Sequence, residues 1–167
     1  MRPRRHARRW IGLLVFGALL LGTAPGASAD SKVALSADLA GQPIRLADVG
    51  KYHCHDLDYP RIHCFRTAGD LAASPPMAAA LLSGVTYVTI YDGASFLGSS
   101  MNVAQDYDIL ALIGWNDRVS SFKARNSLSG RFYVDWYGGG SSWSFCCNTT
   151  ASSLGSLDNT FSSVYQI

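Results

Sequence analysis

The sequence predicts an all-β protein whose main domain is a β-sandwich built from two Greek-key motifs. Three observations lead to this prediction. From Val85 to Tyr91, β-branched and aromatic residues recur with the two-residue period of a strand. A six-residue polar motif occurs twice, starting at Asn116 and again at Asp158, and this spacing is typical of a supersecondary repeat and not of a helical period. All twelve acidic residues are Asp, which favours turns over helix interiors.

The main domain is expected over 85–167, with one Greek key at about 85–126 and a second at about 130–167. In the first unit we expect strands at Val85–Tyr91, Ser99–Val103 and Val119–Arg125, and a loop with one helical turn at Asp106–Ile113. In the second unit we expect strands at Arg131–Tyr137, Trp143–Cys147 and Ser162–Ile167. The last strand closes the sandwich, so truncation there should be damaging.

The segment 1–29 indicates a secretory signal peptide. Five arginines precede an apolar run at Ile11–Leu21, and Ala27-Ser28-Ala29 fits a cleavage site. An uncleaved membrane anchor is the alternative. Cleavage would remove five of the fourteen basic residues and none of the acids, so the net charge becomes −3. We therefore expect a secreted, monomeric protein with no affinity for nucleic acid and no membrane segment in its mature form.

Residues 30–69 are predicted to be an N-terminal extension, and 70–84, rich in Ala, Ser and Pro, a linker with a short helix at Met77–Leu82. The extension contains two cysteines, three histidines and two aspartates between His53 and Cys64, a composition that also suits zinc. Since exported cysteines tend to pair, we favour a Cys54–Cys64 disulfide. Cys146 and Cys147 are further disulfide candidates, and four cysteines allow three connectivities.

The repeated motif has the composition of a cation site. Its copies are Asn116-Asp117-Arg118-Val119-Ser120-Ser121 and Asp158-Asn159-Thr160-Phe161-Ser162-Ser163. Asn, Asp and Ser carry hard oxygen atoms on short side chains, and such turns expose their carbonyls, which together are what calcium prefers. The alternative is a polar turn that bonds only its own backbone. Two copies in register favour calcium.

The double motif resembles the calcium-binding signature of the βγ-crystallin superfamily. That family has a second signature, in which an aromatic residue is followed five residues later by another aromatic, then any residue, then Gly. Tyr91–Gly98 fits this signature without a gap. In the second unit we interpret Tyr137–Phe145 as a variant copy that is one residue longer and ends in Phe.

The resemblance implies two calcium sites shared between the Greek keys. Side-chain oxygens would come from Asp117, Ser120, Asn159 and Ser162, and carbonyls from Arg118 and Thr160. Further carbonyls would come from the hairpins near Ala94 and Ser141, while Asn116 and Asp158 would support the loops or bind through water. Each motif has one carboxylate and Arg118 adds a cation, so dissociation constants of about 10⁻⁶–10⁻³ M are expected.

Catalysis is not expected, because 85–167 contains no His and no Glu, the common general bases. The function predicted from the residues is a secreted calcium-binding module whose fold the metal stabilises. Two alternatives depend on fold and export alone: an inhibitor of a secreted protease, similar to the crystallin-fold metalloproteinase inhibitors of actinomycetes, and an antimicrobial protein similar to the crystallin-like killer toxins.

Overall fold

The computed structural model describes residues 34–167, which lie in one compact unit. The predicted signal peptide and residues 30–33 of the extension lie outside the described residues. The strands are β1 (Ser36–Leu39), β2 (Gln42–Ile44), β3 (His53–Asp58), β4 (Arg61–Phe65), β5 (Tyr87–Tyr91), β6 (Ser100–Val103), β7 (Ser121–Arg125), β8 (Gly130–Tyr133), β9 (Ser142–Phe145), β10 (Thr150–Ala151) and β11 (Ser163–Gln166). The helices are α1 (Ala68–Ala72) and α2 (Pro75–Ser83), with 3-10 helices η1 (Leu46–Lys51), η2 (Ala94–Phe96), η3 (Leu110–Ile113), η4 (Trp136–Gly138) and η5 (Gly155–Leu157). No helix within 34–167 is long and apolar enough to cross a membrane.

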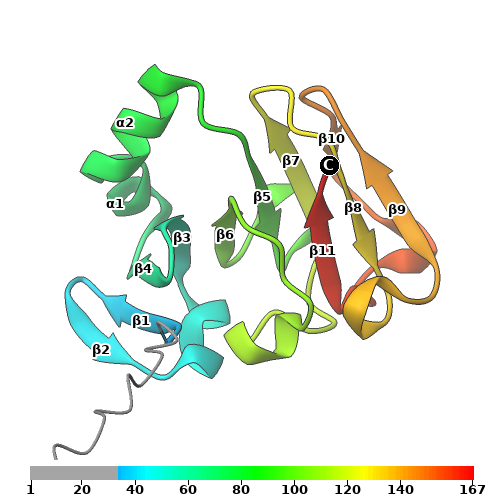
Figure 1. Cartoon of the computed structure of the whole chain (residues 1–167), viewed down its shortest axis with the longest axis horizontal. Coiled ribbons are helices and arrows are strands. Elements are labelled where there is room, and N and C mark those ends of the chain that lie inside the picture. The colour runs from blue at the N-terminus through cyan, green and yellow to red at the C-terminus, as the bar shows by residue number, and fades with distance from the viewer. Residues whose placement is uncertain (1–33) are drawn as a thin grey trace, which may run out of the picture. The chain divides into compact units, whose positions relative to one another are not determined.

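Two sheets form the sandwich, and each Greek key contributes to both of them (Figure 1). The first key supplies β5, β6 and β7 to the larger sheet, and the second supplies β8, β9 and β11 to the three-stranded sheet. The third segment of each key crosses over: β10 pairs with β7, and Tyr107 forms a bridge with Val164 of β11. This exchange confirms the predicted fold class, a sandwich of two interlocked Greek keys.

The N-terminal extension is part of the larger sheet. β3 pairs in parallel with β6, and the order continues through β4, β1 and β2. The expected linker at 70–84 contains α1 and α2; α2 has Pro at its first positions and ends at Gly84, whose φ of 70° suits a helix C-cap. The sequence predicted a separate extension, a linker and a sandwich. In the structure the extension is not separate, because its strand β3 is hydrogen-bonded to β6 of the first Greek key.

Side chains also join the extension to the Greek keys. The buried carboxylate of Asp56 on β3 accepts hydrogen bonds from the Ala104 amide (2.7 Å) and the Tyr107 hydroxyl (3.0 Å). η1 packs directly on η3, where a side chain at Gly50 would lie 2.2 Å from the carbonyl oxygen of Gly114. Only glycine permits this approach of one backbone to the other.

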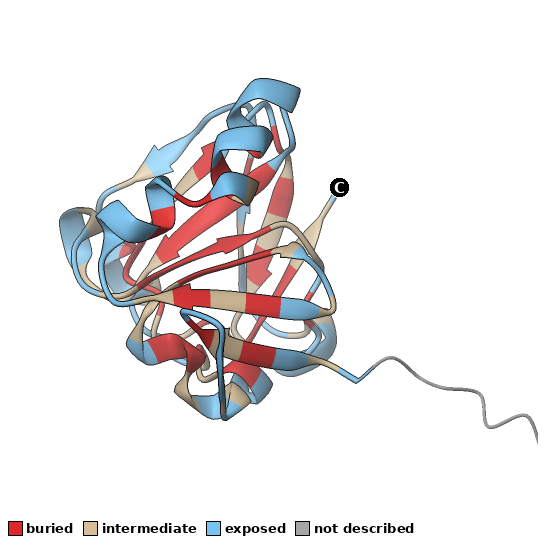
Figure 2. Ribbon diagram, turned by 90° about the vertical axis from the view of Figure 1, so that its left-hand side faces the viewer, coloured by how far each residue is buried: buried red, intermediate tan, exposed pale blue. Residues whose placement is uncertain are grey.

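The main core lies between the two sheets and combines aliphatic residues with a group of four phenylalanines. Four buried phenylalanines are in mutual contact: Phe122, Phe132, Phe145 and Phe161. Phe132 contacts each of the other three and Phe122 also contacts Phe145, with ring centroids 4.9–5.6 Å apart. Figure 2 shows the buried residues concentrated along the strands and the exposed ones in the helices and connections. Such aromatic pairs add to the hydrophobic stabilisation that burial provides.

The predicted disulfide is present. Cys54 and Cys64 lie directly opposite each other on β3 and β4, which the turn at Pro60 connects, and their sulfurs are bonded. Cys146 and Cys147 carry free, exposed thiols. They follow β9, which ends at Phe145 and not at Cys147 as the sequence pattern suggested.

A row of polar residues crosses the larger sheet in register. Asp38 on β1 lies opposite His63 on β4, His63 opposite His55 on β3, and His55 beside Asn102 on β6, which faces Thr89 on β5. Asp38 bonds His63 (2.7 Å) and Thr89 bonds Asn102 (2.7 Å). His55 is fully buried between these pairs, and neither of its ring nitrogens has a hydrogen-bond partner within the described part of the chain.

Candidate metal centre

The two copies of the polar motif lie against each other and exchange equivalent hydrogen bonds. The Asp117 amide donates to the Phe161 carbonyl (2.9 Å), and the Asn159 amide donates to the Val119 carbonyl (3.1 Å). Asp117 and Asn159 are the second residues of their motifs and have left-handed φ angles of 52° and 57°. Asp and Asn tolerate this conformation better than other residues with side chains, which explains part of the motif.

The fifth residue of each motif reaches across to the second residue of the other. Ser120 Oγ donates to Asn159 Oδ1 (3.1 Å), and Ser162 Oγ donates to Asp117 Oδ1 (3.3 Å). Both serines are buried, whereas Asp117 and Asn159 are exposed. The structure thus brings four of the predicted ligand side chains together as two pairs, each with one residue from each motif.

The sixth residue of each motif holds the folded hairpin of its own Greek key. Ser121 Oγ donates to the Gly93 carbonyl (2.6 Å) and accepts from the Phe96 amide (3.0 Å). Ser163 Oγ makes the same pair of bonds to Asp135 (2.7 Å) and Gly138 (3.1 Å). Neither serine was predicted to have a role, although both occupy the same position in the repeated motif.

The second hairpin begins earlier in the chain than the predicted range Tyr137–Phe145. η2 and η4 are equivalent, since each has a left-handed central residue, Ser95 with φ 57° and Tyr137 with φ 56°. The hairpin equivalent to Tyr91–Gly98 is therefore 133–140, shifted along the chain by the same offset as the two polar motifs. Trp136, and not Ser141, stands where Ala94 does in the first hairpin, so Trp136 replaces Ser141 as the candidate carbonyl.

The second hairpin does not match the family's aromatic signature, because two of its positions carry different residues from the first hairpin. In the first hairpin Phe96 packs edge-on against Tyr91, and the Lys123 ammonium lies 4.0 Å from the centre of the Phe96 ring. Gly138 takes the place of Phe96, and a side chain there would lie 3.2 Å from the ring of Tyr165. Tyr165 is the equivalent of Lys123 in the second key and packs edge-on against Tyr133, so its ring fills the space of the missing aromatic.

Each hairpin approaches one of the two side-chain pairs. The Ser120 amide donates to the Tyr91 carbonyl, and the Ser162 amide donates to the Tyr133 carbonyl, both at 2.8 Å. We call the first hairpin with Ser120 and Asn159 the first cluster, and the second hairpin with Ser162 and Asp117 the second cluster. A surface hollow of about 350 Å³ adjoins the second cluster; its lining residues are Val134, Asp135, Trp136 and Ser162.

The first residues of the motifs form hydrogen bonds within and beside the motif loops. Asn116 Nδ2 donates to Asp117 Oδ2 (2.6 Å), and Asn116 Oδ1 accepts from the Trp136 indole (3.1 Å). In the other motif Asn159 Nδ2 donates to Asp158 Oδ2 (3.2 Å). These bonds orient both amides and leave carboxylate oxygens at the surface.

The third residues differ in charge between the copies. The Arg118 guanidinium bonds Asp92 Oδ2 (2.7 Å) and the Gly114 carbonyl (3.0 Å), and it lies over the ring of Trp115. An ion pair with Asp92 offsets much of the positive charge that the sequence placed beside the site. The equivalent Thr160 bonds the Leu157 carbonyl through its hydroxyl (2.8 Å) and adds no charge.

The donor set consists of hydroxyl, amide, carboxylate and carbonyl oxygens. Within 34–167 no three His, Cys, Asp or Glu side chains converge as a metal-binding group. Each cluster instead combines one buried hydroxyl with one exposed amide or carboxylate oxygen, beside a hairpin whose carbonyls are fixed by a serine. Hard oxygens of this mixed kind suit calcium and not soft metals.

Comparison with solved structures identifies similar domains. A βγ-crystallin from an archaeon is 32% identical, covering 50% of this chain and 99% of that chain with a TM-score of 0.44. A βγ-crystallin domain from Flavobacterium johnsoniae is 26% identical (48% and 92%, TM-score 0.43), and a βγ-crystallin from Ciona intestinalis is 24% identical (48% and 99%, TM-score 0.45).

Neither the known family models nor the curated proteins include a match to this chain. The assignment therefore rests on the archaeal protein, to which the identity extends over nearly its whole length, together with the double motif. On this evidence the chain belongs to the βγ-crystallin superfamily.

Proposed function

We propose that this protein is a secreted, non-catalytic module that binds calcium at the two clusters, and that the metal stabilises its fold. The observation that carries the proposal is the reciprocal pairing of Ser120 with Asn159 and of Ser162 with Asp117. A cation placed at either pair would contact oxygens from both motifs and would cross-link the two Greek keys.

The placement of the oxygens supports calcium over a turn that serves only its own backbone. In such a turn the serine hydroxyls would bond nearby main chain. Here Ser120 and Ser162 reach residues that are 39 and 45 positions away in the sequence. The hydroxyls that do bond main chain, those of Ser121 and Ser163, hold the hairpins whose carbonyls would complete each cluster.

The clusters carry little negative charge, so the affinity should be modest. Asp117 is the one carboxylate among the four paired side chains, with Asp135 beside it at the hollow. Calcium affinity rises with ligand charge, and we expect dissociation constants of about 10⁻⁶–10⁻³ M, with the second cluster binding more tightly than the first.

Calorimetric titration of calcium into EDTA-stripped protein tests the proposal. We expect heat of binding for two sites, with Asp117→Asn weakening one of them at least tenfold and Ser144→Ala, on the exposed face of β9, changing neither. Magnesium should bind poorly because it requires a compact octahedral shell. Absence of heat with calcium, or equal effects of the two substitutions, would contradict the proposal.

A further inference from the structure

The second hairpin carries large exposed side chains where the first hairpin carries small ones. The offset that relates the two polar motifs aligns Gly93-Ala94-Ser95 with Asp135-Trp136-Tyr137. The backbones are the same, since the central residues of η2 and η4 have φ/ψ angles of 57°/30° and 56°/31°. Because three small residues are enough to build this hairpin, the acid and the two aromatic residues are not needed to form it.

The two aromatic side chains contribute little to the core. Trp136 is 52% exposed and Tyr137 68%, and they are neighbours in the chain. Tyr137 also has a left-handed φ of 56°, which is unfavourable for a bulky residue. Unfavourable conformations and exposed aromatic residues that folding does not require are concentrated at binding sites. Both features therefore indicate that the second hairpin binds a ligand.

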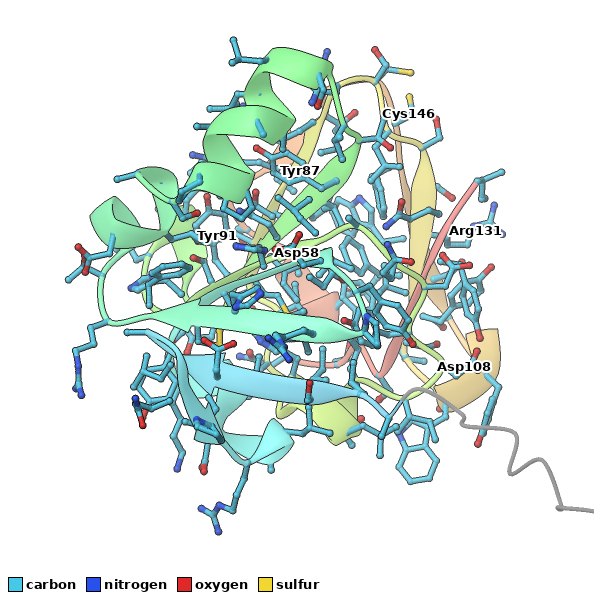
Figure 3. The ribbon with its side chains drawn as sticks, turned by 60° about the vertical axis from the view of Figure 1, so that its left-hand side comes forward. Asp58, Tyr87, Tyr91, Asp108, Arg131 and Cys146 are labelled. Atoms are coloured by element: carbon cyan, nitrogen blue, oxygen red, sulfur yellow. A yellow bond between two sulfur atoms is a disulfide. The ribbon has the colours of Figure 1, made fainter. Side chains whose placement is uncertain are left out.

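Hydrogen bonds to two other parts of the first Greek key hold η4 rigid. The Tyr137 amide donates to the Asp108 carbonyl (3.0 Å), and Figure 3 shows the Asp108 side chain beside η4. The Trp136 indole donates to Asn116 Oδ1 (3.1 Å), which fixes the orientation of the ring. A ring that is already oriented loses little conformational freedom when a ligand packs against it.

The hollow of about 350 Å³ beside Trp136 offers hydrogen-bonding groups of both kinds. The exposed Asp135 carboxylate is an acceptor, and in the part of the chain that the structure describes no basic side chain forms an ion pair with it. Ser162 lines the same hollow with a hydroxyl, and Tyr137 carries a second one; hydroxyls both donate and accept. The volume is at the lower end of the range for small-molecule sites.

We propose that the second hairpin is a binding site for an oligosaccharide of β-linked pyranose rings. When the substituents of a pyranose are equatorial, the ring has a flat face of C–H groups that can pack on an indole. The hydroxyl groups at its edge donate and accept hydrogen bonds. The apolar face matches Trp136, and the edge matches Asp135 and Ser162 in the adjoining hollow.

Other ligand classes fit this surface less well. The phosphates of nucleic acids and anionic membranes are disfavoured, because 132–167 contains two Asp and no Lys, Arg or His. A cationic ligand would pair with Asp135 and the Trp136 ring, but it carries no hydrogen-bond acceptor for the hydroxyls. If calcium binds at Asp117 as proposed above, its charge would repel such a ligand further. In every other respect the oligosaccharide site is independent of the calcium proposal.

Calorimetric titration of the full purified protein with chitohexaose and with cellohexaose tests the proposal. Both are β-linked and have equatorial substituents, and we expect heat of binding with at least one of them. Maltohexaose, which is α-linked and curved, should bind at least tenfold more weakly. No heat with either β-linked sugar, or equal affinity for maltohexaose, would overturn the proposal.

Repeating these titrations in EDTA separates this site from the calcium sites. Sugar binding in EDTA by a protein that gives no heat with calcium would support the oligosaccharide site and refute the calcium proposal. Heat with calcium but with neither β-linked sugar would do the reverse.

A variant that gives the second hairpin the residues of the first tests the location. Trp136→Ala/Tyr137→Ser should keep its far-ultraviolet circular dichroism and lower the sugar affinity at least tenfold. Leu97→Ala is the matched control, since Leu97 is an exposed apolar residue (66%) of the first hairpin, and it should keep the wild-type affinity. Equal affinities of the two variants would place the sugar elsewhere and overturn the proposal. Binding of hexalysine or of phosphatidylserine vesicles, with no binding of either β-linked sugar, would overturn it in favour of a cationic or a membrane ligand.

Discussion

His55 and Asp56 are neighbours on β3, and their buried side chains lie on opposite faces of the sheet with opposite responses to pH. Burial lowers the pKa of His55 to about 4, with the nearby His63 adding to the effect. On the other face, burial raises the pKa of Asp56 to about 7, although its hydrogen bonds to Ala104 and Tyr107 act against this.

His55 and Asp56 change the stability of the fold in opposite directions as the pH rises. Below about pH 6.5 the unfolded chain protonates His55 while the folded chain does not, so His55 reduces stability as the pH falls. Above about pH 3.9 the unfolded chain ionises Asp56 while the folded chain keeps it protonated, so Asp56 reduces stability as the pH rises toward 7. Between about pH 4 and 6.5 both groups lower the stability, but their opposite pH slopes should largely cancel, so the wild-type stability should change little with pH through these two residues.

Single substitutions should therefore reveal opposite slopes. Relative to the wild type, the unfolding free energy of His55→Gln should fall with increasing pH between 4 and 6.5, by up to about 1.4 kcal/mol per pH unit. That of Asp56→Asn should rise with increasing pH over the same range. Urea unfolding at a series of pH values measures both, and parallel curves for the two variants would contradict the assignment.

Ser121→Ala and Ser163→Ala should destabilise the protein with or without calcium. Each removes a buried hydroxyl that makes two main-chain bonds in its hairpin, and we expect a loss of about 2–3 kcal/mol. Ser120→Ala in EDTA should cost only about 0.5–1 kcal/mol, since its bonding partner Asn159 is exposed. Chemical unfolding in EDTA distinguishes the two classes, and equal losses would mean that the fifth and sixth serines have the same role.

Loss of the Cys54–Cys64 bridge should lower stability by about 2–4 kcal/mol, because the bridge restricts the unfolded chain. The double variant Cys54→Ala/Cys64→Ala should show this loss in urea unfolding. Cys146→Ser/Cys147→Ser is the matched control and should keep the wild-type stability in dilute protein. Equal stability of both double variants would show that the buried bridge contributes nothing.

Trp136 should report calcium binding at the second cluster. Its indole donates to Asn116, the neighbour of Asp117, and the ring is 52% exposed. Calcium at Asp117 should alter this contact and change the tryptophan emission. Trp136→Phe should lose the calcium-dependent change, and Trp143→Phe should keep it. The opposite pattern would place the metal away from the second hairpin.

The features that repeat within the sequence could be predicted from it, whereas those that depend on contacts between distant segments could not. The motif pair, the first hairpin and the strand pattern were readable because local composition determines them. The second hairpin was misplaced because Gly138 takes the position of Phe96, and its partner Tyr165 is distant in the sequence. Applying the spacing of the two polar motifs to Tyr91–Gly98 would have located it.

The extension could not be placed from the sequence. Nothing in the pattern of 53–58 shows which sheet edge β3 joins, because parallel pairing with β6 is decided by packing far along the chain. Asp56 accepts hydrogen bonds from Ala104 and Tyr107, and these bonds hold β3 against the first Greek key. The partners are remote from Asp56 in the sequence, so the pattern does not reveal them. The Cys54–Cys64 pair was predictable because a single turn separates the two cysteines.

Thermal unfolding in calcium and in EDTA tests the central claim most directly. A ligand that binds only the folded state at a hundredfold excess over its dissociation constant adds about 2.7 kcal/mol per site. For a domain of this size that corresponds to a rise in Tm of roughly 5–10 °C per site. We predict that calcium raises the Tm by at least this amount, that magnesium does not, and that Ser120→Ala and Ser162→Ala each reduce the rise. Superimposable curves in calcium and EDTA would contradict the account and leave the two motifs as turns that bond only each other.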